Sequence, residues 1–227
     1  MHAKNLIVAL LIACLAVVSL RADEPKAAPK KNDPTKWEKD ISKFEAMDKE
    51  KHQKKGQILF VGSSSIRLWN LGKSFPGLDA INRGFGGSQI EDSTFYADRI
   101  VTHYEPRTIV LYAGDNDLNS GKSAEQVAED YKQFVAKVRA KLPKVKIVFI
   151  AIKPSIARWK NVHNVRKANE IIAKQCAADG NMVFVDIDKP MMGEDGKPRE
   201  ELLVKDGLHL SEKGYEIWTG LVKPHLE

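Results

Sequence analysis

Two polar segments of the chain hold residue types that could carry out acyl transfer. Asp206 and His209 stand three positions apart, directly before a predicted helix, so the carboxylate can contact one imidazole nitrogen. The other nitrogen is then free to take a proton from a serine hydroxyl. Ser64 follows an apolar run at the start of another predicted helix, beside free backbone N–H groups. Each segment alone also has a structural explanation, because serine is a common helix N-cap residue and Asp-x-x-His pairs are frequent.

Two further loops could bind negative charge. Residues 84–88 hold three glycines in four positions, which lets the backbone approach a ligand closely and point N–H groups at an anion. This loop lacks the dinucleotide-binding fingerprint, because Gln89 fills the place of its final glycine. In residues 114–119, Asn116 offers a neutral amide that could hold an oxyanion. The acidic residues around Asn116 suggest a calcium loop, but the EF-hand positions for glycine and glutamate are filled by other residues.

These four segments are placed by strand-like apolar runs that alternate with helical patterns. Uninterrupted apolar runs are typical of strands buried on both faces of a parallel sheet. They predict strands over residues 58–61, 79–82, 108–112, 146–151 and 182–185. Helices are predicted over residues 123–142, 161–178 and 211–221, the first with Ser123 and Gln126 as a capping box. The pattern predicts a three-layer α/β/α fold with a flavodoxin-like, doubly wound, five-stranded parallel sheet, whose functional groups gather beyond the carboxyl ends of the strands.

Taken together and in this order, the four segments resemble the sequence blocks of the SGNH (GDSL-type) hydrolases, in the branch of the platelet-activating-factor acetylhydrolase catalytic subunits. The resemblance covers about residues 57–226, and its blocks are Gly62-Ser63-Ser64, Gly84-x-Gly86-Gly87, Gly114-x-Asn116-Asp117 and Asp206-x-x-His209. It implies a serine esterase of the SGNH hydrolase fold that works through an acyl-enzyme without a metal or organic cofactor. Ser64 would be the nucleophile, His209 the base and Asp206 its orienter. The oxyanion donors would be Ser64, Gly87 and Asn116.

One position departs from the pattern of that family. Ser63 stands where the signature usually has an aspartate between the first glycine and the nucleophile. That aspartate is not a triad member, so activity need not be lost, but the hydrogen bonding of the first loop must differ. Ser63 and Ser65 stay open as alternative nucleophiles, while the alignment of the block favours Ser64. The Gly-x-Ser-x-Gly elbow of the α/β-hydrolase fold is absent, because Ile66 fills the place of its last glycine.

The substrate is less closely defined by the sequence. Exposed candidates for the rim of the site are Arg67, Trp69, Arg83, Arg158 and Trp159. An arginine beside an aromatic ring could stack on a sugar or hold an anionic group, although Trp159 could equally pack against the next helix. No long apolar lid segment is present, so we expect short acyl groups, acetyl above all, on a carbohydrate or small ester. A lysophospholipid is the alternative substrate, and a non-enzymatic glycan-binding module is the alternative function.

The first 22 residues have the layout of a secretory signal peptide, with Lys4 before an apolar run over residues 6–20. That run is short for a membrane-spanning helix, so we expect an exported mature chain without a membrane span. Cys14 lies in a sequence typical of a lipid-modified cysteine, which leaves an anchored form as the alternative. Residues 23–33 are expected to be a flexible linker and residues 34–227 the hydrolase domain.

The formal net charge of +6 arises largely from lysines crowded into residues 26–55. A basic arm on a nearly balanced body favours solubility or a polyanionic surface over nucleic-acid binding. Within residues 34–50, one helix face is predicted to pack on the body and is formed by Trp37, Ile41, Phe44 and Met47. Cys176 is expected to be a small buried hydrophobic residue. The sequence indicates no oligomeric state.

Overall fold

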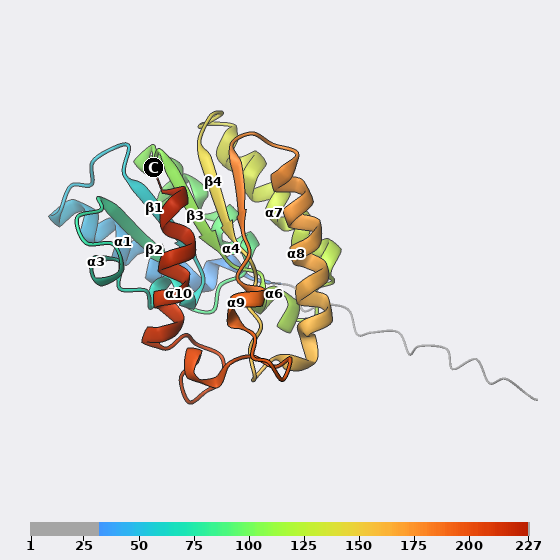
Figure 1. The fold of residues 1–227 in the computed structure, drawn as a ribbon. Helices are drawn as coiled ribbons and strands as arrows, with labels where there is room; N and C mark the ends of the chain where they lie inside the picture. Colours follow the sequence, from blue (N-terminus) through green and yellow to red (C-terminus); the bar gives the residue numbers. More distant parts are fainter. Residues whose placement is uncertain (1–31, 227) are drawn as a thin grey trace, which may run out of the picture.

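A parallel sheet of five strands lies at the centre of residues 32–226, the part of the chain that the computed structural model describes (Figure 1). The strand order is β2-β1-β3-β4-β5, and every neighbouring pair is parallel. The strands are β1 (Ile58–Gly62), β2 (Ala80–Gly84), β3 (Thr108–Tyr112), β4 (Lys146–Ile150) and β5 (Met182–Val185). The predicted fold class is confirmed, and the five predicted strands differ from the observed ones by at most two residues at either end.

Helices connect the strands and cover the sheet. The α-helices are α1 (Glu38–Glu50), α2 (Ser64–Arg67), α3 (Leu71–Ser74), α4 (Ile90–Phe95), α5 (Ala97–Ile100), α6 (Asp115–Asn119), α7 (Ala124–Arg139), α8 (Val162–Ala177), α9 (Asp188–Met191) and α10 (Glu212–Val222). Short 3₁₀ helices are η1 (Pro34–Trp37), η2 (Thr102–Tyr104), η3 (Trp159–Asn161), η4 (Glu200–Leu202) and η5 (Lys223–His225). The three long predicted helices are α7, α8 and α10, and both reciprocal hydrogen bonds of the Ser123–Gln126 capping box are made. The sequence pattern does not predict α4 and α5, because each is too short to show a helical period.

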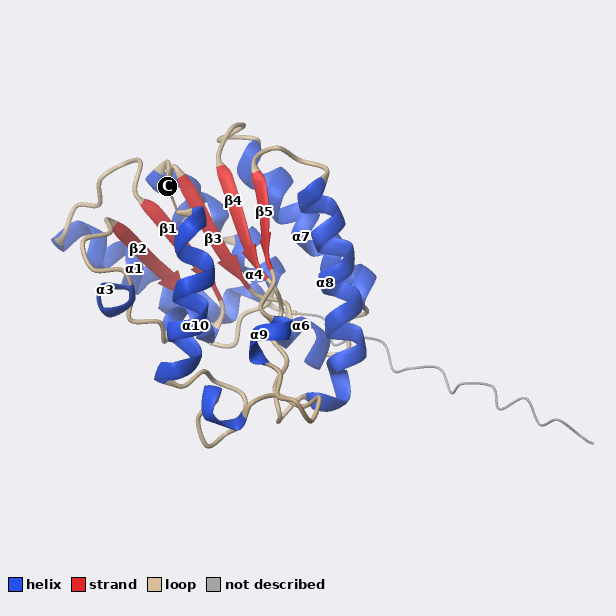
Figure 2. Cartoon of the chain, viewed as in Figure 1, coloured by secondary structure: helices blue, strands red, loops and turns tan. Residues whose placement is uncertain are grey.

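Alternate side chains of each strand enter two apolar layers on opposite faces of the sheet. Leu59, Ile109 and Ile147 belong to the layer covered by α1, α4, α5, α7 and α8. Phe60 and Val110 belong to the layer covered by α9 and α10. Figure 1 shows α10 across one face of the sheet, away from α7 and α8. The arrowheads in Figure 2 all point to one edge of the sheet, so the loops that follow the strands gather there.

The N-terminal helix packs on the body with one correction to the prediction. Ile41 is fully buried, and Trp37 and Phe44 contact the core, but Met47 is 54% exposed. The inward position at this end of α1 is Asp48, whose carboxylate accepts hydrogen bonds from the Tyr104 hydroxyl and from an arginine of β2. Since each residue turns a helix by about 100°, the side chain after Met47 faces the sheet and Met47 faces outward.

Several predictions made for the N-terminus fall on residues that are not described. The signal peptide, Cys14 and nearly all of the linker lie outside residues 32–226. Among the residues that the structure does describe, no helix is both long and apolar enough to cross a membrane. Cys176 is buried as predicted; its sulfur lies 3.4 Å from the Tyr131 hydroxyl, and burial raises the pKa of the thiol.

An ion pair joins the C-terminal ends of α7 and α8 and makes stability depend on pH. The Arg139 guanidinium contacts both carboxylate oxygens of Asp179, and its hydrogen bond lowers the pKa of Asp179 to about 2. Because this pKa lies below that of the unfolded chain, the stabilisation is present above about pH 4 and is lost as the pH falls toward 2. We expect Asp179→Asn to lower the free energy of unfolding by about 1–2 kcal/mol at neutral pH, after allowance for solvent screening.

Urea unfolding followed by circular dichroism at pH 7 and pH 3 measures this effect. The difference between the wild type and Asp179→Asn should shrink at pH 3, and Arg139→Met should show the same pH dependence. A difference of equal size at both pH values would mean that the pair does not stabilise the fold through its charge.

Candidate active site

Ser64 is placed by a tight glycine turn at the end of β1. Gly62 has a φ of +130°, and a Cβ at this position would lie 2.0 Å from the carbonyl oxygen of Tyr112 in β3. The Ser63 N–H donates a 3.0 Å hydrogen bond to that same carbonyl. The chain therefore passes directly over the neighbouring strand and begins α2 at Ser64, which is partly exposed. Only glycine fits this turn, because any side chain would collide with the backbone of β3.

The two serines beside Ser64 face away from the solvent. Ser63 is 3% exposed and occupies the N-cap position of α2, but its hydroxyl makes no capping hydrogen bond. Ser65 is 2% exposed, and its carbonyl accepts a 2.8 Å hydrogen bond from the Tyr215 hydroxyl. Ser64 is therefore the serine of this run whose hydroxyl reaches the edge of the sheet.

His209 lies within hydrogen-bonding distance of Ser64 and is held by Asp206. Its Nε2 is 3.0 Å from Ser64 Oγ, and its Nδ1 is 2.6 Å from Asp206 Oδ2. The other carboxylate oxygen accepts the backbone N–H groups of Leu208 and His209, so a local turn fixes Asp206. The hydrogen bond from His209 is the main reason that the pKa of Asp206 falls to about 2. An ionised carboxylate keeps the proton on Nδ1, which leaves Nε2 as an acceptor for the serine proton.

Gly87, in the loop after β2, lies beside Asn116, in α6 after β3. A Cβ on Gly87 would lie 3.8 Å from the amide nitrogen of Asn116, so the two residues are in contact. The Asn116 Nδ2 donates to the Ser88 carbonyl at 3.0 Å, which leaves its second N–H free for another acceptor. Within residues 32–226, the backbone N–H groups of Ser64 and Gly87 have no protein hydrogen-bond acceptor. Each of these three N–H groups is thus free to donate to a bound anion.

Asp117 joins the loops that carry Gly87 and Asn116. This carboxylate is fully buried, accepts the Ile90 N–H at 3.2–3.3 Å, and pairs with Lys122 at 3.4 Å. Burial raises its pKa to about 7, against the opposing effect of Lys122. Asp115, on the same loop, pairs with Arg158. The two carboxylates that suggested a calcium loop therefore bind cationic side chains of the chain itself.

Comparison with known proteins shows the family of this chain. The sequence model of the GDSL-like lipase/acylhydrolase family matches residues 67–217, beginning three residues after Ser64. The chain belongs to this family. It is accordingly a carboxylic-ester hydrolase of the GDSL type, which sets aside the alternative of a non-enzymatic glycan-binding module.

Relatives of this GDSL hydrolase share its fold over most of the chain. The platelet-activating factor acetylhydrolase IB subunit alpha2 of Gallus gallus is 26% identical over 188 residues, 76% of each chain. A solved structure from Streptococcus pneumonia superposes with a TM-score of 0.75 at 21% identity, covering 85% of this chain and 94% of that one. A carbohydrate esterase family 3 structure from Talaromyces cellulolyticus gives a TM-score of 0.59 at 19% identity, covering 75% and 96%. The two structural matches show a common fold.

Two of the predicted rim residues of the GDSL hydrolase are buried, so their prediction as exposed rim residues is wrong. Arg83 is 3% exposed, because alternate side chains of β2 face the layer under α1 and this arginine lies there beside Asp48 and Tyr104. Trp69 is 2% exposed and packs edge-on against Phe60 under α2. Neither side chain stands free at the edge of the sheet where Ser64 lies.

The other three rim predictions have different outcomes. Arg67 is exposed on α2, one turn after Ser64. Arg158 is partly buried, and its guanidinium contacts Asp115 and Asn116 instead of standing free. Trp159 is partly buried, with the Arg166 guanidinium of α8 over its ring at 5.9 Å, which supports its packing against the next helix.

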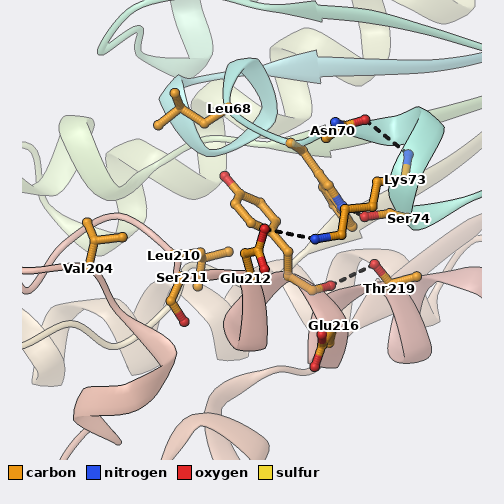
Figure 3. Close-up of a pocket in the computed structure, with 12 residues that line it drawn as sticks. Leu68, Asn70, Lys73, Ser74, Val204, Leu210, Ser211, Glu212, Glu216 and Thr219 are labelled. Atoms are coloured by element: carbon orange, nitrogen blue, oxygen red, sulfur yellow. Dashed lines mark hydrogen bonds and ion pairs between the residues drawn. The ribbon is translucent and has the colours of Figure 1, made fainter.

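A hollow of about 510 Å³ is lined by residues that follow Ser64 and His209 in the chain (Figure 3). It lies between the chain after α2 and the first turns of α10, and Leu68 and Leu210 line it directly after the two site segments. Leu68 and Val204 are each 45% exposed at its rim. The Lys73–Glu212 ion pair, 2.8 Å long, closes one side of it. Since its lining contains apolar, hydroxyl and charged groups, it suits an amphipathic ligand more than a purely apolar one.

Sequence reasoning missed the buried lysine behind the site. Lys153 is 2% exposed, and its ammonium lies 3.2 Å from the Tyr112 hydroxyl and 3.5 Å from Asp115. A signal was present, because Lys153 directly follows the apolar β4 segment, where a charge needs a buried partner. That partner lies 38 residues earlier in the chain and cannot be found from local spacing.

Proposed function

We propose that this GDSL hydrolase removes short acyl groups, acetyl above all, from neutral carbohydrate or small-molecule esters, with Ser64, His209 and Asp206 as its catalytic triad. The observation that carries the proposal is the continuous set of contacts from Ser64 Oγ through the imidazole to the Asp206 carboxylate. Arrangements of this kind activate a serine hydroxyl for attack on an ester carbonyl. The Ser64 and Gly87 N–H groups, which have no acceptor among the described residues, support a role in holding the oxyanion.

The reaction proceeds through an acyl-enzyme. His209 Nε2 takes the Ser64 proton as Oγ bonds to the ester carbon, and the carbonyl oxygen becomes an oxyanion held by Ser64 N–H, Gly87 N–H and the Asn116 amide. The bond to the leaving oxygen then breaks, and His209 returns the proton to that oxygen. Water next gives a proton to His209 and attacks the acyl carbon. In the tetrahedral intermediate so formed, the bond between the acyl carbon and Ser64 Oγ breaks, His209 gives its proton to Oγ, and the acid is released.

The hollow lined by Leu210, the residue after His209, supports a neutral alcohol as the leaving group. The leaving oxygen must face Nε2, and the hollow is bordered by the residues that follow His209 in the chain. Its charged lining groups are two glutamates, Glu212 and Glu216, and one lysine, Lys73, which is paired with Glu212. An anionic headgroup would be repelled by this surplus of negative charge. The name of the acetylhydrolase relative adds support for an acetyl group, and that of the carbohydrate esterase structure adds support for a sugar.

Acyl-chain selectivity tests the proposal. We expect kcat/KM for p-nitrophenyl acetate to exceed that for p-nitrophenyl octanoate by about 10-fold or more, because discrimination of acyl groups by size is typically of this order. Acetate release from an acetylated xylo-oligosaccharide, followed by an enzyme-coupled assay, should be saturable. Faster turnover of the octanoate ester, or of lysophosphatidylcholine, would replace the proposal with a lysophospholipase-type acylhydrolase.

A further inference from the structure

Arg158 lies behind the proposed oxyanion site rather than on the surface around it. Its side chain is 16% exposed; its Nη1 forms an ion pair with Asp115 Oδ2 at 2.8 Å and donates a hydrogen bond to Asn116 Oδ1 at 3.0 Å. The ammonium of Lys153 contacts the same carboxylate oxygen at 3.5 Å. These contacts form a largely buried chain of charged and polar groups that ends on the side-chain amide of Asn116.

The two ends of the Asn116 amide contact groups of opposite hydrogen-bonding character. Nδ2 donates to the Ser88 carbonyl, which can only accept, and Oδ1 accepts from the Arg158 guanidinium, which can only donate. Rotation of the amide by 180° would place its nitrogen against the guanidinium and its oxygen against the carbonyl. Both hydrogen bonds would then become repulsive contacts, so the pair of partners allows one orientation of the amide.

Without Arg158, only the bond to Ser88 would oppose this rotation. The charged donor also draws electron density toward Oδ1, which strengthens the free N–H of Nδ2 as a donor. The fixed orientation and the polarisation both act on the free N–H of Asn116, which is proposed to bind the carbonyl oxygen of the substrate. Both effects are largest when that carbonyl oxygen becomes negatively charged.

The loop that carries Arg158 is joined to the loop that carries the general base. Ala157 N–H donates to the Gly207 carbonyl at 3.0 Å, and Gly207 has a φ of +64°. A Cβ on Gly207 would lie 3.2 Å from Ile156 Cβ, so the two loops are closely packed. Arg158 is therefore held between the Asp206–His209 turn and the oxyanion donors, in a position fixed from both sides.

We propose that Arg158 is a positioning residue that fixes and polarises the Asn116 amide for oxyanion binding, with Lys153 and Asp115 holding the guanidinium in place. The proposal rests on the proposed function, because it requires Asn116 to be an oxyanion donor. It replaces the expectation that Arg158 binds an anionic part of the substrate. The two roles differ in the kinetic constant that they change, since a positioning residue acts on kcat and a binding residue acts on KM.

The test compares Arg158→Met, Asn116→Ala and the double variant in hydrolysis of p-nitrophenyl acetate, a neutral ester. We expect Asn116→Ala to lower kcat by about 10²-fold, as for loss of one oxyanion donor. Arg158→Met should lower kcat by about 10-fold with little change in KM, because the donor is kept but is no longer held. The double variant should be no slower than Asn116→Ala alone, since Arg158 acts through the amide.

Two further variants guard against a trivial loss of activity. Arg158→Lys keeps a charged donor that can reach Asp115 and Asn116, and it should recover part of the lost kcat. Arg166→Met removes a neighbouring arginine that pairs with Asp188 and does not contact Asn116, and it should leave kcat unchanged. Circular dichroism and urea unfolding establish that each variant is folded. If Arg158→Met does not fold, the comparison is made with Arg158→Lys, alone and with Asn116→Ala, where the same lack of additivity is expected.

The results separate failure of this inference from failure of the proposed function. An equal loss from the arginine substitution in the presence and absence of Asn116, or a rise in KM alone, would overturn the positioning role. A normal kcat in Asn116→Ala would instead remove Asn116 from the oxyanion site, and the proposed catalytic assignment would fail at that residue. A larger KM effect on an anionic ester than on the neutral one would return Arg158 to the substrate-binding role.

Discussion

Ser64→Ala is expected to lower kcat for p-nitrophenyl acetate by about 10⁴- to 10⁶-fold, the range typical of loss of a serine nucleophile. The substitution removes the oxygen that lies 3.0 Å from His209 Nε2 and leaves no other hydroxyl at that distance among the described residues. The oxyanion donors and His209 are retained, so a low residual rate from a directly activated water should persist. Steady-state kinetics and mass spectrometry measure the effect, because the wild type should accumulate an acetyl adduct with a slow substrate and the variant should not.

Ser63→Ala and Ser65→Ala are the matched controls for this prediction. Both remove a hydroxyl from the same run of three serines, but these hydroxyls lie on residues that are only 3% and 2% exposed and make no contact with His209. We expect their rates to stay within a few-fold of the wild type. A large loss in either control, together with substantial activity in Ser64→Ala, would move the nucleophile to the neighbouring serine.

The fold could be predicted from the sequence because its central strands are buried on both faces. Such strands need continuous apolar runs, and runs of this kind coincide with β1, β3 and β4. The direction of individual side chains was harder to predict. Arg83 follows a strand-like run and was expected at the edge of the sheet, but it lies inside β2 and faces α1. An error of two residues in the end of a strand is enough to move a side chain from the loop region into the core.

Some residues of the candidate site can be recognised from the local sequence, and others depend on contacts between distant segments. Asp206 and His209 are three residues apart, and Ser64 directly follows a strand, so their types and spacing are visible in the sequence. The groups that hold these residues come from distant segments, because Arg158 contacts Asn116 across 42 positions and Lys153 contacts Asp115 across 38. Pairings of that range depend on the strand order β1-β3-β4, which a single sequence does not contain. This is why the sequence predicts that Arg158 faces the substrate, whereas the structure places it against the side-chain oxygen of Asn116.

Asp206→Asn is expected to lower kcat/KM by about 10²- to 10⁴-fold. The upper end of this range is the loss typical of the same substitution at a buried triad carboxylate. Asparagine can still accept the Leu208 and His209 backbone N–H groups through Oδ1, so the turn should survive. Its Nδ2 would then face His209 Nδ1 as a donor. Nδ1 must accept that hydrogen bond, which moves the imidazole proton to Nε2 and removes the acceptor for the Ser64 proton. The Asp206 side chain is 47% exposed. The loss is nearer 10²-fold if water at this exposed position lets the imidazole proton return to Nδ1.

The pH dependence of the variant distinguishes this tautomer effect from a loss of charge. Because the hydrogen bond from His209 lowers the pKa of Asp206 to about 2, the wild-type carboxylate is ionised throughout the range of an esterase assay. If Asp206 acted only through its charge, its loss would favour the neutral imidazole, so the deficit of the variant would shrink as the pH falls. With the proton held on Nε2, the deficit should persist between pH 6 and 9. Asp195→Asn is the matched control, since Asp195 forms a similar turn with the Lys197 N–H in an exposed loop and should tolerate the change; a deficit of Asp206→Asn that shrinks toward pH 6 would contradict the tautomer argument.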